Sequence, residues 1–206
     1  MPKEHESYHF PSLTSDRRAA IDAFLEKLHT QATVTPGTRG RLVFALDATA
    51  SRQPTWDMAC QLHAEMFEEV ARLGGLDIQL IYYRGVRECQ ASHWISDART
   101  LADIMMRIKC IPGQTQIGRV LAHARKEDDK QKLQALAFVG DCVEEEPADL
   151  CAIADELGKR DVRLFIFQEG EKPLLRKCFS RSHAGLRAHT VSLELLRARL
   201  GTPLAD

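Results

Sequence analysis

Short apolar runs alternate with amphipathic segments along most of the chain, and this alternation limits the fold more than any other feature. The segments 42–46, 133–142 and 161–170 each contain a continuous apolar run, which predicts strands that are buried on both faces. Segments with helical apolar spacing separate these runs, and one of them opens at Pro54, a residue suited to a first helical turn. The alternation predicts a mostly parallel sheet with helices on both faces.

The same patterns place the individual elements. We expect strands over residues 42–46, 76–85, 88–96, 133–142, 161–170 and 186–192, and helices over 15–31, 54–73, 97–109, 147–158, 171–183 and 193–200, with a further helix from about residue 117. The segment 88–96 follows 76–85 too closely for a crossover helix, so we expect an antiparallel edge strand there. The predicted class is therefore α/β: a doubly wound, Rossmann-like sheet. Residues 1–38 are expected to form a polar tail and a helix, and residues 39–206 the α/β domain.

Charge and cysteine content exclude several function classes. The formal net charge is −1 and no long basic run is present, so we expect no binding to nucleic acid or to anionic membranes. No apolar stretch has the length of a membrane span, and the polar N-terminus lacks the apolar core of an export signal. The six cysteines form no C-x-x-C pair, which argues against structural zinc and predicts reduced thiols in a cytoplasmic protein.

Polar side chains follow two of the predicted strands and precede one helix. "DATAS" places Asp47, Thr49 and Ser51 after the first strand, "GQTQIG" places Thr115 before a helix, and Asp141 follows "LAFVG". In a doubly wound sheet these positions share the edge formed by the carboxyl ends of the strands, where ligands bind. Two carboxylates and three hydroxyls suit a hard divalent ion, so we predict a site for Mg²⁺, with Mn²⁺ or Ca²⁺ as alternatives.

These three segments resemble the metal-ion-dependent adhesion site (MIDAS) of von Willebrand factor type A (VWA) domains. That pattern is D-x-S/T-x-S, then a threonine in a G-x-T-x-x-G-type loop, then an aspartate after the fourth strand. Asp47, Thr49, Ser51, Thr115 and Asp141 match it, with Gly113 and Gly118 as the flanking glycines and Leu121 as the apolar position after them. The resemblance covers about residues 40–192 and makes residues 39–206 a VWA-like domain.

The resemblance implies a function as well as a fold. In this family the ion keeps one coordination position for a carboxylate of a partner protein. The chain would then be a non-enzymatic adaptor that binds the Asp or Glu of a partner, as intracellular relatives do in multi-protein machines that include AAA+ ATPases. Arg52 after Ser51, and Gly140 and Cys142 around Asp141, depart from the usual pattern and bear on metal affinity and metal choice.

Other interpretations of the same residues remain open. Asp47 and its neighbours could cap the following helix, or Asp47 could be the nucleophile of a Mg²⁺-dependent phosphoryl-transfer or hydrolytic enzyme. Cys142 or Cys89 could be a redox-sensitive thiol, although Cys142 fits better as a packing residue. The acidic run at 144–146 could line the site, but helix-start carboxylates are the favoured interpretation. Tyr82, Tyr83, Arg84 and Arg87 could contact a ligand, with Arg84 the best candidate for holding a partner's acid, or they could belong to a solvated loop.

Overall fold

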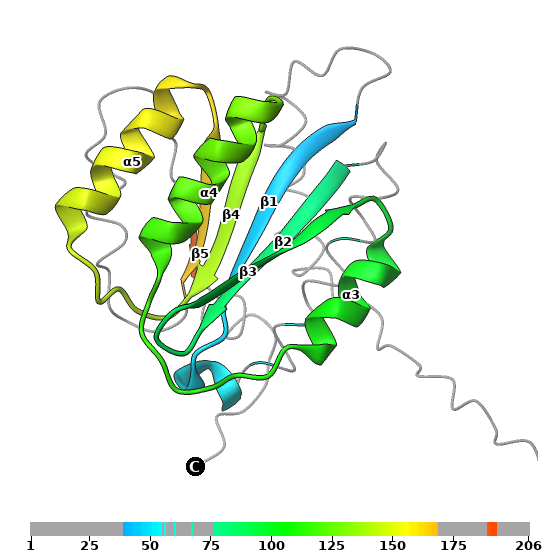
Figure 1. Ribbon diagram of the computed structural model, residues 1–206, viewed down its shortest axis with the longest axis vertical. Helices are drawn as coiled ribbons and strands as arrows, with labels where there is room; N and C mark the ends of the chain where they lie inside the picture. The colour runs from blue at the N-terminus through cyan, green and yellow to red at the C-terminus, as the bar shows by residue number, and fades with distance from the viewer. Residues whose placement is uncertain are drawn as a thin grey trace, which may run out of the picture.

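The computed structural model describes residues 39–54, 56, 60, 67 and 76–168, together with the backbone of 189–192. Six strands form one sheet in the order β3-β2-β1-β4-β5-β6 (Figure 1). Their bounds are β1 (Gly40–Asp47), β2 (Leu76–Arg84), β3 (Glu88–Ile95), β4 (Ala135–Gly140), β5 (Arg163–Gln168) and β6 (His189–Ser192). All neighbours pair in parallel except β2 and β3, which are antiparallel. The predicted fold class is confirmed.

The antiparallel edge has a local cause. Only residues 85–87 separate β2 from β3, so the chain must turn back on itself. Gly85 opens this turn with a φ of +59°, a backbone conformation that residues with a Cβ rarely adopt.

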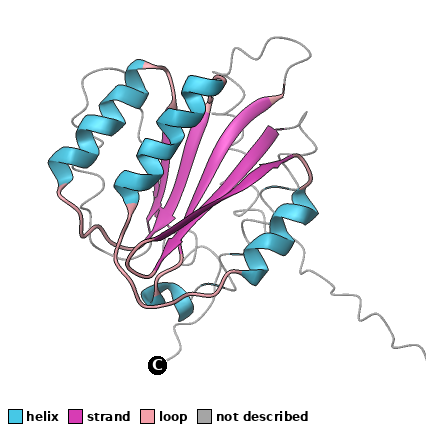
Figure 2. Cartoon of the chain, viewed as in Figure 1, coloured by secondary structure: helices cyan, strands magenta, loops and turns pink. Residues whose placement is uncertain are grey.

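Helices cover both faces of the sheet (Figure 2). A short 3-10 helix, η1 (Ala50–Arg52), follows β1, and the chain continues as helix at Gln53 and Pro54. The three longer helices are α3 (Ala98–Arg107), α4 (Ile117–Lys130) and α5 (Pro147–Lys159). The helices predicted over 15–31, 171–183 and 193–200 lie outside the described residues, as does most of 54–73.

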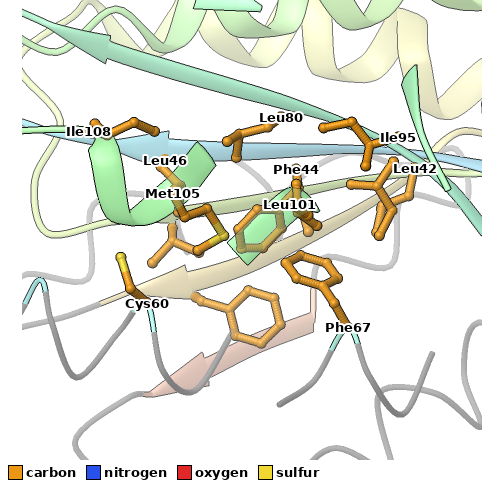
Figure 3. Close-up of a cluster of buried hydrophobic side chains, with 14 of the residues drawn as sticks. Leu42, Phe44, Leu46, Cys60, Phe67, Leu80, Ile95, Leu101, Met105 and Ile108 are labelled. Atoms are coloured by element: carbon orange, nitrogen blue, oxygen red, sulfur yellow. The ribbon is translucent and has the colours of Figure 1, made fainter. Parts of the chain in front are cut away.

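Each face of the sheet has its own apolar core. On one face, Val43 and Ala45 of β1 pack in a cluster with residues of α4 and α5, such as Leu121 and Leu157. On the other face, Phe44 packs in a cluster with Leu101 of α3 and the helical residue Phe67 (Figure 3). The rings of Phe44 and Phe67 meet edge to face with centroids 4.8 Å apart. Successive β1 side chains thus enter opposite layers, which explains why this strand is apolar throughout.

A buried ion pair attaches α4 to the sheet. Arg41 of β1 and Glu127 of α4 are 6% and 3% exposed, and their side chains lie 3.1 Å apart. The Trp94 indole donates to the same carboxylate oxygen at 3.3 Å and lies under the Arg41 guanidinium, 3.8 Å from it. Burial opposes ionisation of Glu127, but hydrogen bonds from Lys130 and Trp94 outweigh it and lower the pKa of the carboxyl. The network joins β1, β3 and α4.

Glu127→Gln is expected to lower the free energy of unfolding by about 3 kcal/mol, because it leaves the buried Arg41 guanidinium without its counter-charge. Urea unfolding at neutral pH measures the change. Glu156→Gln is the matched control, since it breaks the exposed pair between α5 and Arg125 of α4 and should have little effect. Equal losses in the two variants would contradict the assigned role of the buried network.

No helix among the described residues is long and apolar enough to cross a membrane.

Candidate metal centre

The predicted site begins where β1 ends, at the carboxyl edge of the sheet. Asp47 is the last residue of β1 and pairs in register with Tyr83 of β2, while β4 on the other side ends at Gly140. A Cβ at Gly140 would lie 3.4 Å from that of Asp47 and 2.7 Å from the ring of Phe138. The position before Asp141 therefore has no space for the Cβ of a threonine unless the Phe138 ring moves.

Asp47 is fully buried and held on both carboxylate oxygens. Oδ1 accepts a hydrogen bond from the Thr49 amide at 2.9 Å, and Oδ2 accepts one from the Tyr83 hydroxyl at 2.9 Å. Burial raises the pKa of Asp47, and the nearby charge of Asp141 raises it further, against the lowering effect of hydrogen bonds from Thr49 and Tyr83. The two predicted carboxylates are thus close enough to repel each other.

The two hydroxyls after Asp47 lie side by side. Thr49 Oγ1 and Ser51 Oγ are 3.1 Å apart, with Thr49 buried and Ser51 exposed. Thr49 precedes η1, yet its side chain makes no capping hydrogen bond to that turn. Thr49 therefore does not cap η1, whereas the helix predicted over 54–73 lies mostly outside the described residues. The two hydroxyls thus lead from the buried Asp47 to the protein surface.

Thr115 is tied to the loop that carries Asp141. The Thr115 amide donates to the Glu144 carboxylate at 2.9 Å, and the Glu144 amide donates back to Thr115 Oγ1 at 3.0 Å. Thr115 is 5% exposed and directly precedes Gln116, the N-cap residue of α4. This reciprocal pair joins the second and third predicted segments although 26 positions separate Thr115 from Asp141.

Glu145 holds the start of α4 in the same way. Its carboxylate accepts hydrogen bonds from the amides of Ile117 at 2.5 Å and Gly118 at 2.8 Å, two donors that the first turn of a helix cannot satisfy internally. The acidic run was expected to supply carboxylates to the start of the helix that follows it, but Glu144 and Glu145 accept hydrogen bonds from the start of α4 and the loop before it. Their sequence position had pointed to α5, the helix that follows them.

Glu145→Gln is expected to lower the free energy of unfolding by about 1–2 kcal/mol, because it weakens two charge-assisted hydrogen bonds at a helix N-terminus. Glu146→Gln provides the control, since Glu146 is exposed and makes no side-chain capping bond to α5. Chemical denaturation of both variants in EDTA measures the difference without any contribution from metal. A loss for Glu146→Gln as large as for Glu145→Gln would contradict the assignment.

Asp141 carries the most unusual polar atom of the site. Its Oδ1 is buried and has no hydrogen-bond partner, a costly arrangement for a carboxylate. The thiol of the neighbouring Cys142 donates a hydrogen bond to the Asp141 side chain. Burial, together with the charge of Asp141, raises the pKa of Cys142 to about 12. Burial also raises the pKa of Cys89. Both shifts disfavour the thiolate form that a redox sensor uses.

Arg84 and Tyr83 at the end of β2, which the sequence offered as contacts for a ligand, are engaged within the protein. Arg84 pairs with Glu88 at 2.8 Å and donates to the Lys109 carbonyl at 2.9 Å, so this guanidinium is already engaged. Tyr83 is fully buried and supports Asp47 instead of contacting a ligand. Arg52 is 1% exposed, so it is not a surface cation that could recruit an anion. The register of β1 with β2 places Tyr83 beside Asp47, and no sequence pattern indicates that register.

Comparison with known proteins bears on the fold. The Rpn10 VWA domain (SpRpn10) superposes on 82% of this chain and 100% of its own with a TM-score of 0.60 and 13% identity. The manganese-loaded TRAP protein of Plasmodium vivax gives a TM-score of 0.59 at 15% identity over 78% of this chain and 71% of its own. The chain has the von Willebrand factor type A fold. No family model and no curated protein matches the sequence.

A third structure of similar fold belongs to a longer chain. Proximal thread matrix protein 1 from the mussel byssus, with a zinc-occupied MIDAS motif, matches with a TM-score of 0.55 and 18% identity over 78% of this chain and 43% of its own. Among the described residues of the present VWA fold, no group of three His, Cys, Asp or Glu side chains is arranged to hold a metal.

Proposed function

We propose that this chain is a non-enzymatic protein-binding module that holds a divalent cation and uses it to bind a carboxylate of a partner protein. Asp47, Thr49, Ser51, Thr115 and Asp141 would hold the ion. The observation that carries the proposal is the buried Asp141 Oδ1, which has no hydrogen-bond partner in a place where a cation would satisfy it. The repulsion between Asp141 and Asp47 would be relieved by the same ion.

The donor set favours magnesium. Carboxylate and hydroxyl oxygens are hard ligands, and a site with few carboxylates suits an ion that keeps some of its waters. Two aspartates balance the double positive charge, and the neutral hydroxyls leave the bound ion able to attract one more anionic oxygen. The manganese-loaded and zinc-occupied structures of similar fold support a divalent ion at this edge, and Mn²⁺ or Ca²⁺ remain alternatives here.

The exposure of the site fits a partner outside the molecule. Asp47, Thr49 and Thr115 are buried, whereas Ser51 and the loop residues 111–114 are exposed. An ion held below this surface would present its remaining position outward, toward the Asp or Glu of a partner. The VWA resemblance suggests that the partner belongs to a multi-protein machine such as an AAA+ ATPase system, in the cytoplasm.

The geometry of Asp47 argues against the alternative of a phosphoryl-transfer or hydrolytic enzyme. A carboxylate nucleophile must reach its substrate, but Asp47 is 0% exposed and accepts hydrogen bonds on both oxygens. We expect no turnover of generic phosphoesters in the presence of Mg²⁺. Turnover that Asp47→Asn abolishes would reject the adaptor function.

Immobilised protein tests the proposal directly. Partner proteins should be retained in Mg²⁺ and released by EDTA, and Thr115→Val should abolish this retention because it replaces a metal ligand by a methyl group of the same shape. Thr100→Val is the control, since Thr100 lies at the start of α3, where its hydroxyl contacts Asp97. Retention that neither EDTA nor Thr115→Val affects would contradict the proposal.

A further inference from the structure

Large apolar side chains are exposed at few places in the described part of the chain, and two of them flank the proposed metal site. Val86 is 71% exposed, Met106 68% and Ile111 37%. Val86 lies in the turn between β2 and β3, and Ile111 lies in the loop between α3 and α4. Both segments lie at the carboxyl edge of the sheet, near η1 (Figure 1). Met106, by contrast, belongs to the last turn of α3.

Backbone contacts hold these two segments together and against Thr49. Ile111 forms an isolated parallel bridge with Thr49, and its amide donates to the Ala48 carbonyl at 3.1 Å. The Ile111 side chain lies over Gly85, whose Cβ position is 3.6 Å from its Cδ1 atom. The Gln114 amide donates to the Gly85 carbonyl at 3.0 Å. The segments that carry Val86 and Ile111 are thus held together beside a proposed metal ligand, and we call these two exposed apolar side chains the apolar rim.

The two sides of the site differ in charge. On the β4 side, the exposed acids Glu144 and Glu146 would repel an acidic partner. On the β2 side, Val86 is followed by the exposed cation Arg87. An acidic segment that reaches the metal is therefore steered toward the apolar rim and away from the β4 side.

We propose that the partner segment carries an aliphatic or aromatic residue next to its metal-binding Asp or Glu, and that this apolar side chain packs on Val86 and Ile111. The inference rests on the proposed function, because it assumes that a carboxylate binds the ion. Burial of one apolar side chain on this rim is expected to strengthen binding about tenfold.

Selection from random heptapeptides displayed on phage tests the inference, because such a library pairs acids with apolar and with polar neighbours alike. The parent protein in Mg²⁺ should enrich peptides in which an acid lies beside an apolar residue, and EDTA should abolish the enrichment. The double variant Val86→Ser, Ile111→Ser should still select acidic peptides but should bind the parent's best peptide about tenfold more weakly. Met106→Ser, an equally exposed change on α3, should behave like the parent.

Two results would overturn the inference, and they differ in what else they reject. Mg²⁺-dependent selection of acidic peptides without an apolar preference, or with the same preference in the double variant, rejects the apolar rim and leaves the proposed function standing. No Mg²⁺-dependent selection at all rejects the proposed function and the inference with it. Equal stabilisation of the parent and the double variant by Mg²⁺ verifies that the substitutions leave the metal site intact.

Discussion

Asp141→Asn is expected to be more stable than the parent protein in EDTA and less stable than it in saturating Mg²⁺. Without metal, the change removes one of two carboxylates that repel each other and gives the buried position an uncharged amide. With metal, the parent gains about 2.7 kcal/mol at a Mg²⁺ concentration one hundred times its Kd. The variant lacks an anionic ligand and should show little gain.

Thermal or urea unfolding of both proteins in EDTA and in Mg²⁺ measures this reversal. Asp149→Asn, an exposed change in the first turn of α5, is the matched control and should keep the full gain from Mg²⁺. A purely structural role for Asp141 predicts a loss in both conditions. An Asp141→Asn variant that is destabilised in EDTA and still gains from Mg²⁺ would therefore contradict the account.

Gly113→Ala is expected to lower the free energy of unfolding by about 4 kcal/mol and to abolish Mg²⁺ binding. A Cβ at this position would lie 2.2 Å from the Gly85 carbonyl oxygen and 2.3 Å from the Gly85 nitrogen, so it would collide with backbone that cannot rotate away. The loop that carries Thr115 would have to leave the end of β2. Both stability and metal affinity should fall for the same reason.

Gly118→Ala is the control within the same motif. A Cβ there would meet the end of the Glu145 side chain at 3.1 Å and Leu150 Cδ2 at 3.5 Å, and a flexible carboxylate can move by a few tenths of an ångström. Alanine also favours the helix that contains this position. Unfolding in EDTA and calorimetric titration with Mg²⁺ should show a near-normal protein. If Gly113→Ala is as stable as Gly118→Ala and binds Mg²⁺ equally well, the close approach of Gly113 to Gly85 is contradicted.

The sequence predicted the architecture because its signals are local. Apolar runs in 42–46 and 161–170 mark β1 and β5, and the short gap between the runs 76–85 and 88–96 predicts the antiparallel edge strand. The carboxyl ends of parallel strands share one edge, so Asp47 and Asp141 could be placed on the same edge of the sheet from the alternation of strands and helices. That these residues hold an ion stays a prediction.

Tertiary contacts supplied what the sequence could not. Glu144 and Glu145 stand beside α5 in the sequence, yet their carboxylates bind the Thr115 loop and the start of α4, which only the packing of α4 against the sheet brings near. Arg84 is different, because its partner Glu88 lies only four positions away, across the turn that the sequence itself predicts. For the acidic run alone, the nearest partner in space differs from the nearest in sequence.

A crystal grown in Mn²⁺ tests the central claim most directly, because manganese can be located by its anomalous scattering. The account predicts one strong peak at the carboxyl edge of the sheet, held directly or through water by oxygens of Asp47, Thr49, Ser51, Thr115 and Asp141. It also predicts that the peak disappears in Thr115→Val crystals grown in the same way. A well-ordered edge without a manganese peak, or a peak held by other side chains, would contradict it.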